Sequence, residues 1–196
     1  MFAKSALVVA LAVLAGCSTA APQASFTANL VSPTDIELQW PDDDPAAAGR
    51  MVEYATDPAG PWTTLQYLPA HQSSYRHPDL IPETPFYYRV RPFYGPVSAE
   101  VLADAPSAAG AFHASVSADK TVKFTWTDQT PDEDGFLVEI RRPGAPGFEP
   151  IEVSDPNTTS CVLSLLDGEH GSAYRLRTLH YGALSPVVHQ TTGKDS

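Results

Sequence analysis

The chain has 196 residues, of which 43% are hydrophobic, and a formal net charge of −11. The apolar content excludes a disordered polymer, and the acidity disfavours binding to nucleic acid or to anionic lipid head groups, which both need a basic surface. The 19 prolines argue against a helical protein, because proline breaks helix interiors and is tolerated in turns and at strand edges.

Residues 1–16 have the composition of a signal peptide. Lys4 supplies the positive charge at its start, and an uninterrupted apolar run follows from Ala6 to Ala15. A helix of this length spans about 15 Å, half of the roughly 30 Å hydrocarbon thickness of a bilayer. The segment is therefore predicted to direct export and not to span the membrane.

The segment ends in Leu14-Ala15-Gly16-Cys17, which resembles the lipobox of bacterial lipoproteins. The resemblance implies cleavage before Cys17 and acylation of this cysteine, and residues 17–24 would form a lipidated tether. The alternative is an ordinary secretory signal with a chance cysteine. Ser18 stands where an Asp is associated with inner-membrane retention in Gram-negative lipoproteins, so the outer membrane is the expected destination if the source is Gram-negative.

After residue 24, short stretches alternate apolar and polar residues with a period of two, as in half-buried strands, and turn residues separate them. Apolar residues on one expected face occur at positions 36, 38 and 40, at 52 and 54, and at 86, 88 and 90. No window has a sustained helical period. The fold class predicted from these patterns is all-β.

The expected strands occur twice. The numbers of Trp40 and Trp126 differ by 86, and Val52-Glu53-Tyr54 has the same relation to Val138-Glu139-Ile140. Farther along, Tyr94-Gly95 corresponds to Tyr181-Gly182 with an offset of 87. A period of this length indicates a whole small domain repeated in tandem.

Both repeats resemble fibronectin type III domains, with Trp40 and Trp126 at the family's strand-B tryptophan. The resemblance implies two tandem immunoglobulin-like β-sandwiches, at residues 25–103 and 111–193, with a linker at 104–110. Because the linker is short and its residues are mostly small, we expect two tandem beads with limited freedom.

In this family a tyrosine near the turn between strands E and F bonds back to the backbone. The resemblance assigns that role to Tyr174 and places Phe86 at the equivalent position, unless Tyr87 or Tyr88 takes over. It also aligns Leu166 with Leu80 and predicts that Cys161 points inward from a strand.

The sequence contains no nucleophile–base set, phosphate-binding loop or zinc spacing, so we predict no catalytic residue, no metal and no cofactor. Asp42, Asp43 and Asp44 are expected in a solvated turn. Asp128 to Asp134 lacks the full spacing of a calcium loop, and Asp128 is expected to cap its own turn.

Three aromatic residues remain as candidates for a binding surface: Trp62, Tyr94 and Tyr181. Partly exposed aromatic side chains suit protein or sugar contacts, although each could instead pack over its own sheet edge. The predicted function is a non-enzymatic, membrane-anchored binding or scaffolding lipoprotein that contacts an envelope or extracellular protein. The alternative is a carbohydrate-binding accessory protein for cell-wall or extracellular glycan.

Overall fold

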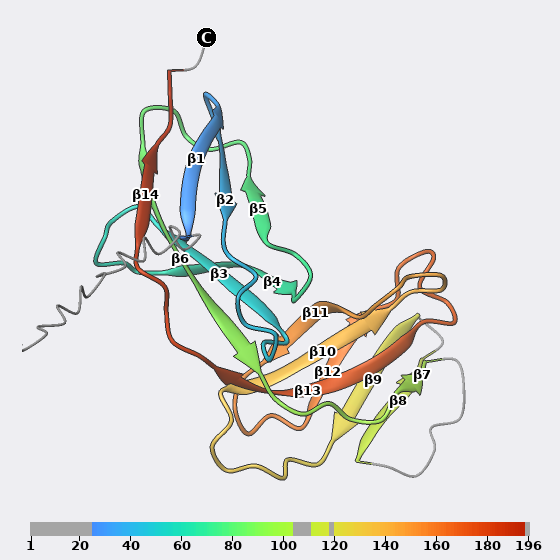
Figure 1. Ribbon diagram of the computed structural model, residues 1–196. Helices are drawn as coiled ribbons and strands as arrows, with labels where there is room; N and C mark the ends of the chain where they lie inside the picture. The colour runs from blue at the N-terminus through green and yellow to red at the C-terminus, as the bar shows by residue number, and fades with distance from the viewer. Residues whose placement is uncertain (1–24, 104–110, 118–119, 195–196) are drawn as a thin grey trace, which may run out of the picture.

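The computed structural model describes residues 25–103, 111–117 and 120–194 and contains fourteen strands in these ranges (Figure 1). The predicted signal peptide, the tether with Cys17 and the 104–110 linker lie outside the described residues. The strands are β1 (Thr27–Ser32), β2 (Asp35–Gln39), β3 (Gly49–Ala55), β4 (Thr63–Pro69), β5 (Ser74–His77), β6 (Pro85–Tyr94), β7 (Val101–Leu102), β8 (Phe112–Val116), β9 (Thr121–Trp126), β10 (Gly135–Arg141), β11 (Glu149–Ser154), β12 (Ser160–Ser164), β13 (Ala173–Tyr181) and β14 (Val188–Thr191).

These strands form two β-sandwiches. In the first, the three-stranded sheet β1-β2-β5 packs on β3, β4, β6 and β14 around a core that includes Trp40 and Val52. In the second, β12-β9-β8 packs on β10, β11, β13 and β7 around a core that includes Trp126 and Val138. The all-β class, the two tandem sandwiches and the core location of both tryptophans are confirmed.

The two sandwiches share one sheet. Its strands run in the order β11-β10-β13-β6-β3-β4, and β13 joins β6 through the pairs His180↔Tyr94 and Tyr181↔Phe93. Phe93, Leu137 and Leu179 form a separate, fully buried cluster, against which Tyr181 packs. The expectation of tandem beads is therefore wrong, because main-chain hydrogen bonds and an apolar cluster join the two units.

Each sandwich is completed by a strand from the other half of the chain. After β6 the chain crosses over, and β7 pairs with β13 of the second sandwich. After β13 the chain crosses back, and β14 pairs with β6 of the first sandwich, where Val188 lies opposite Tyr88. Figure 1 shows β14, in dark red, beside the blue and green strands of the first sandwich. Neither sandwich is thus built from the continuous segments 25–103 or 111–193 alone.

The segments that cross over make matching hydrogen bonds. Ser98 donates its N–H to the carbonyl of Leu176 (2.8 Å), and its hydroxyl accepts the N–H of Leu176 (3.0 Å). Ser185 makes the same two bonds with Val90, at 2.8 and 3.0 Å. The two crossings are therefore related by the internal repeat.

The turns between the family's strands E and F lie between β5 and β6 and between β12 and β13. Their residues correspond to one another differently from the sequence-based alignment. Tyr54 pairs with Tyr88 as Ile140 pairs with Tyr174, so Tyr88, and not Phe86, is the equivalent of Tyr174. The Tyr88 hydroxyl lies 3.2 Å from Nδ1 of His77.

The leucine that anchors the turn in the second sandwich is Leu165, because it is buried whereas Leu166 is 61% exposed. Cys161 packs against the second core, as predicted. Burial raises the pKa of the Cys161 thiol to about 11, which keeps it protonated at neutral pH.

Candidate binding site

Trp62 lies in the turn between β3 and β4 and is partly buried. The guanidinium carbon of Arg89 lies 4.2 Å from the centre of the indole, and Nε of Arg89 donates to Glu53 at 2.7 Å. A Cβ at Gly60 would lie 2.9 Å from the Trp62 ring, and Gly60 has a φ of +93°, so a glycine is needed for the ring to fold back here. One face of Trp62 is thus covered by an arginine of its own sheet.

Tyr181 takes part in the contact between the sandwiches. Its hydroxyl is hydrogen-bonded to the hydroxyl of Tyr67, and the guanidinium carbon of Arg91 lies 3.8 Å from the centre of its ring. Burial raises the pKa of Tyr181. Its aromatic surface is thus largely used inside the molecule.

Tyr94 ends β6 and orders the acidic turn. Its hydroxyl donates to Oδ2 of Asp44 at 2.5 Å, and the backbone N–H of Ala46 donates to Oδ1 of the same carboxylate at 3.1 Å. The hydrogen bond from Tyr94 holds the pKa of Asp44 below its usual value. Tyr94 and Tyr181 therefore lie at the junction of the sandwiches, whereas Trp62 belongs to a separate turn.

Carboxylates of the second acidic segment, Asp128 to Asp134, accept hydrogen bonds from backbone N–H groups. Asp128 accepts the N–H of Thr130 at 3.1 Å, which confirms the predicted cap. Glu133 accepts the N–H of Asn157 at 3.0 Å, and Asp134 accepts that of Tyr181 at 2.7 Å. Within the part of the chain that the structure describes, no group of three or more His, Cys, Asp or Glu is placed to hold a metal ion.

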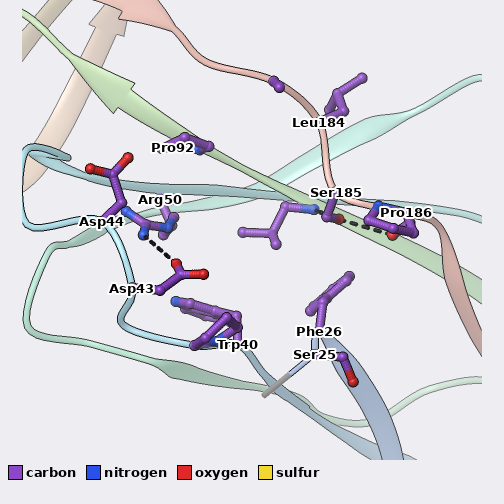
Figure 2. A pocket seen from close by; sticks show the side chains of 13 residues that line it. Ser25, Phe26, Trp40, Asp43, Asp44, Arg50, Pro92, Leu184, Ser185 and Pro186 are labelled. Atoms are coloured by element: carbon purple, nitrogen blue, oxygen red, sulfur yellow. Dashed lines mark hydrogen bonds and ion pairs between the residues drawn. The ribbon is translucent and has the colours of Figure 1, made fainter. Parts of the chain in front are cut away.

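A cavity of about 430 Å³ opens in the first sandwich, where the segment from β13 to β14 crosses over the ends of β1, β2, β3 and β6. Figure 2 shows Phe26 and Trp40 on one side and Leu184, Ser185 and Pro186 of the crossing segment beside them. Arg50, Asp43 and Asp44 form the polar end. The cavity thus combines apolar walls with three charged side chains.

The three charged side chains of the cavity differ in the hydrogen bonds and ion pairs that fix them. Arg50 is only 7% exposed, yet its guanidinium donates one bond, from Nη1 to the carbonyl of Gly49 at 3.3 Å. Its nearest carboxylate is that of Asp43, at 4.0 Å from Nη2, and the Asp43 side chain is 69% exposed. Asp44, in contrast, is fixed by Tyr94 and Ala46.

The second sandwich has the corresponding cavity, with a volume of about 220 Å³. Phe112, Trp126 and Ser98 take the places of Phe26, Trp40 and Ser185. The position of Arg50 is occupied by Phe136, whose ring centre lies 5.4 Å from that of Trp126. The positions of Asp43 and Asp44 are occupied by Gln129 and Thr130. The second cavity is therefore smaller and uncharged.

None of the residues at the polar end of the first cavity was selected from the sequence as a binding residue. The signal was present in the repeat, since Gly49-Arg50-Met51-Val52 aligns with Gly135-Phe136-Leu137-Val138. Arg50 is a cation where the second repeat has the aromatic residue Phe136. This difference between the repeats would have identified the polar end of the cavity.

Neither a protein-family model nor a curated protein matches the sequence. Among solved structures, the chain is similar to a segment of two fibronectin type III domains from chicken tenascin, with 13% identity, 85% of this chain and 98% of that chain covered, and a TM-score of 0.32. It is also similar to the FN1–FN3 domains of chicken CNTN1, with 12% identity, 88% and 67% covered, and a TM-score of 0.32.

The strands define the class directly: this is an all-β protein of two tandem, immunoglobulin-like β-sandwiches. The described residues include no helix that is long and apolar enough to cross a membrane.

Proposed function

We propose that the protein is a non-enzymatic binding lipoprotein of the bacterial cell envelope, held to a membrane through Cys17 and contacting an envelope or extracellular protein with its two sandwiches. The observation that carries the binding role is the shared sheet, which fixes the surfaces of both sandwiches relative to each other. A preorganised surface binds at a smaller entropic cost than two independent domains would.

The anchor is supported by the sequence Leu14-Ala15-Gly16-Cys17. Several acyl chains hold a protein to a bilayer far more firmly than one chain does. From Cys17 to Phe26 the chain can reach at most about 30 Å, so the first sandwich would lie close to its membrane. Confinement of this kind raises the effective concentration of a weak binding surface.

The anchor is tested by comparing the native protein with the Cys17→Ser variant in membrane fractionation, together with mass spectrometry of the mature N-terminal peptide. We expect an acylated peptide and a membrane-bound native protein, and release of the variant. An unacylated peptide, or a variant that fractionates like the native protein, would remove the anchor from the proposal.

The binding role is tested by crosslinking in intact envelopes followed by affinity recovery. A protein recovered reproducibly with the native chain supports the proposal, provided that the chain is not retained on insoluble cell-wall glycan. Retention on glycan that is lost with Trp62→Ala would favour the alternative, since Trp62 is partly exposed and is not part of the cluster or the strand pairing that joins the sandwiches. Tyr181→Ala is unsuitable here, because Tyr181 packs at the junction.

A further inference from the structure

Two buried arginines of this protein differ in their partners. Arg177 is 8% exposed, and its guanidinium donates twice to the buried carboxylate of Glu139, at 3.0 and 3.2 Å, and once to the carbonyl of Gly95 at 2.7 Å. Arg50 is equally buried, but within the part of the chain that the structure describes its guanidinium has a single long hydrogen bond and a carboxylate at 4.0 Å. A guanidinium carries five N–H donors. None of the Arg50 nitrogens is both fully buried and without a partner, so the donors that make no protein hydrogen bond open onto water in the cavity and can donate to a ligand.

The fold does not require a cation at this position. Arg50 lies on the inward face of β3, two residues before the core residue Val52, and its equivalent Phe136 belongs to the core of the second sandwich. The two sandwiches have the same strand arrangement with either residue. The charge of Arg50 thus needs an explanation other than folding.

We propose that the cavity of the first sandwich binds a carboxylate carried on an apolar body, with Arg50 as the partner of the carboxylate and Asp43 as the counter-ion that the ligand displaces. This names a ligand site for the binding role proposed above, and it does not depend on the membrane anchor. The planar fork of a guanidinium matches a carboxylate through two parallel hydrogen bonds. Phe26, Trp40 and Leu184 supply the apolar walls.

The two aspartates of the cavity have different roles in this proposal. Asp44 keeps its bonds to Tyr94 and Ala46 and stays in place. Asp43 is mostly exposed, and with the residues that the structure describes its side chain makes only the loose pair with Arg50, so it can turn into solvent when another carboxylate arrives. A pair whose carboxylate is exposed to solvent is weak, whereas a bidentate pair inside the cavity is shielded from water. The volume of about 430 Å³ suits a small organic acid or the last residue of a chain.

The test compares two probes that differ only at the group in question: N-acetylphenylalanine, which has a carboxylate, and its uncharged amide. Both are titrated by NMR and calorimetry into a soluble chain that begins at residue 18, so a failure of the anchor does not affect the result. We expect the acid to bind at least about tenfold more tightly than the amide, since charge-assisted bidentate bonds exceed neutral ones.

Substitutions of the cavity residues test which of them cause the preference for the acid over the amide. Arg50→Phe, which copies the second sandwich, should abolish the preference for the acid while the melting curve stays cooperative. Asp43→Asn, at an exposed position, should tighten binding of the acid several-fold because it removes the competing carboxylate. Leu184→Ala should weaken binding of the acid, whereas Val97→Ala, the matched change in the second cavity, should leave it unchanged.

The proposal would be overturned by equal affinities for acid and amide, by no saturable binding of the acid at millimolar concentration, or by weaker binding of the acid to Asp43→Asn. The last result would indicate a cationic ligand. These outcomes do not depend on whether Arg50→Phe folds, because the probe comparison uses the chain from residue 18 with Arg50 unchanged, and Asp43 is exposed.

Discussion

Two buried glutamates, Glu53 and Glu139, occupy equivalent positions on the shared sheet but hold different partners. The Glu139 side chain is 3% exposed and is paired with both Arg175 and Arg177. The Glu53 side chain is 9% exposed, and Arg89 is its one ion-pair partner among the described residues, since the guanidinium of Arg91 stacks over Tyr181 instead. Arg91, the equivalent of Arg177, thus contacts an aromatic ring at the junction of the sandwiches, whereas Arg177 contacts the glutamate of its own sandwich.

This difference predicts unequal losses of stability. Glu139→Ala leaves two arginines without their carboxylate and should lower the free energy of unfolding by about 3–5 kcal/mol, as for other broken buried ion pairs. Glu53→Ala frees one arginine, which is partly exposed, and should cause roughly half that loss. Urea unfolding of both variants measures the difference, and equal losses would contradict the assigned partners.

At the residue scale, the alternation of apolar and polar residues predicted the two cores well, because every second side chain of a half-buried strand points inward. Trp40, Trp126 and Cys161 lie where the sequence placed them. The assignments of Phe86 and Leu166 were wrong, because the alignment across the turns depends on which tyrosine pairs with Tyr54 and on which leucine is buried, and sequence alone shows neither. Arg50 was missed because a single charged residue at a core position does not disturb a period-two pattern.

At the scale of elements, the two crossing segments are the parts that join the repeats. Each contains a serine whose hydroxyl, in place of a main-chain carbonyl, accepts an N–H of the neighbouring strand. Ser98 accepts the N–H of Leu176, and Ser185 accepts that of Val90. The hydroxyl allows the crossing chain to leave the regular ladder while the N–H of the neighbouring strand stays bonded. This is how a proline-rich connection passes over the sheet without leaving a buried donor unpaired.

Replacing that hydroxyl should therefore destabilise the protein. Ser185→Ala leaves the N–H of Val90 without an acceptor and should lower the free energy of unfolding by about 1–3 kcal/mol. Ser98→Ala should cause a loss of similar size at Leu176. Ser160→Ala on the exposed surface of β12 serves as the control and should change stability by less than about 0.5 kcal/mol in the same calorimetric measurement. An unchanged free energy of unfolding in Ser185→Ala would contradict the role of the hydroxyl.

The exchange of strands could not be predicted from sequence for a physical reason. Val101 and Val188 occupy equivalent places, and each lies opposite a tyrosine of a last long strand, Tyr174 or Tyr88. Either valine would fit beside either tyrosine, so the local pattern specifies a strand but not the sandwich that it joins. That choice depends on contacts between the two repeats.

At the scale of the whole molecule, the shared sheet and the exchanged strands make one body from two repeats. The fully buried residues Phe93, Leu137 and Leu179 lie between the sandwiches and not inside either core. The same crossing that brings β14 to the first sandwich also supplies the wall of the Arg50 cavity, through Leu184 and Pro186. The candidate ligand site therefore exists only because the last strand of the chain returns to the first repeat.

The exchange is tested most directly by cysteine pairs in a soluble chain that begins at residue 18 and carries Cys161→Ser. Tyr87 lies opposite His189 of β14, and their rings stack with centres 5.7 Å apart. Strand residues that face each other in this way have Cα atoms close enough for a disulfide. In an arrangement without exchange, Leu102 of β7 would instead lie opposite Tyr87.

We predict that the pair Tyr87→Cys and His189→Cys forms a disulfide within the monomer, detected as a linked peptide by mass spectrometry. The pair Tyr87→Cys and Leu102→Cys should remain reduced under the same conditions, because Leu102 pairs with Ala173. Formation of the Tyr87–Leu102 crosslink in place of the Tyr87–His189 crosslink would contradict the strand exchange, and with it the single body and its cavity.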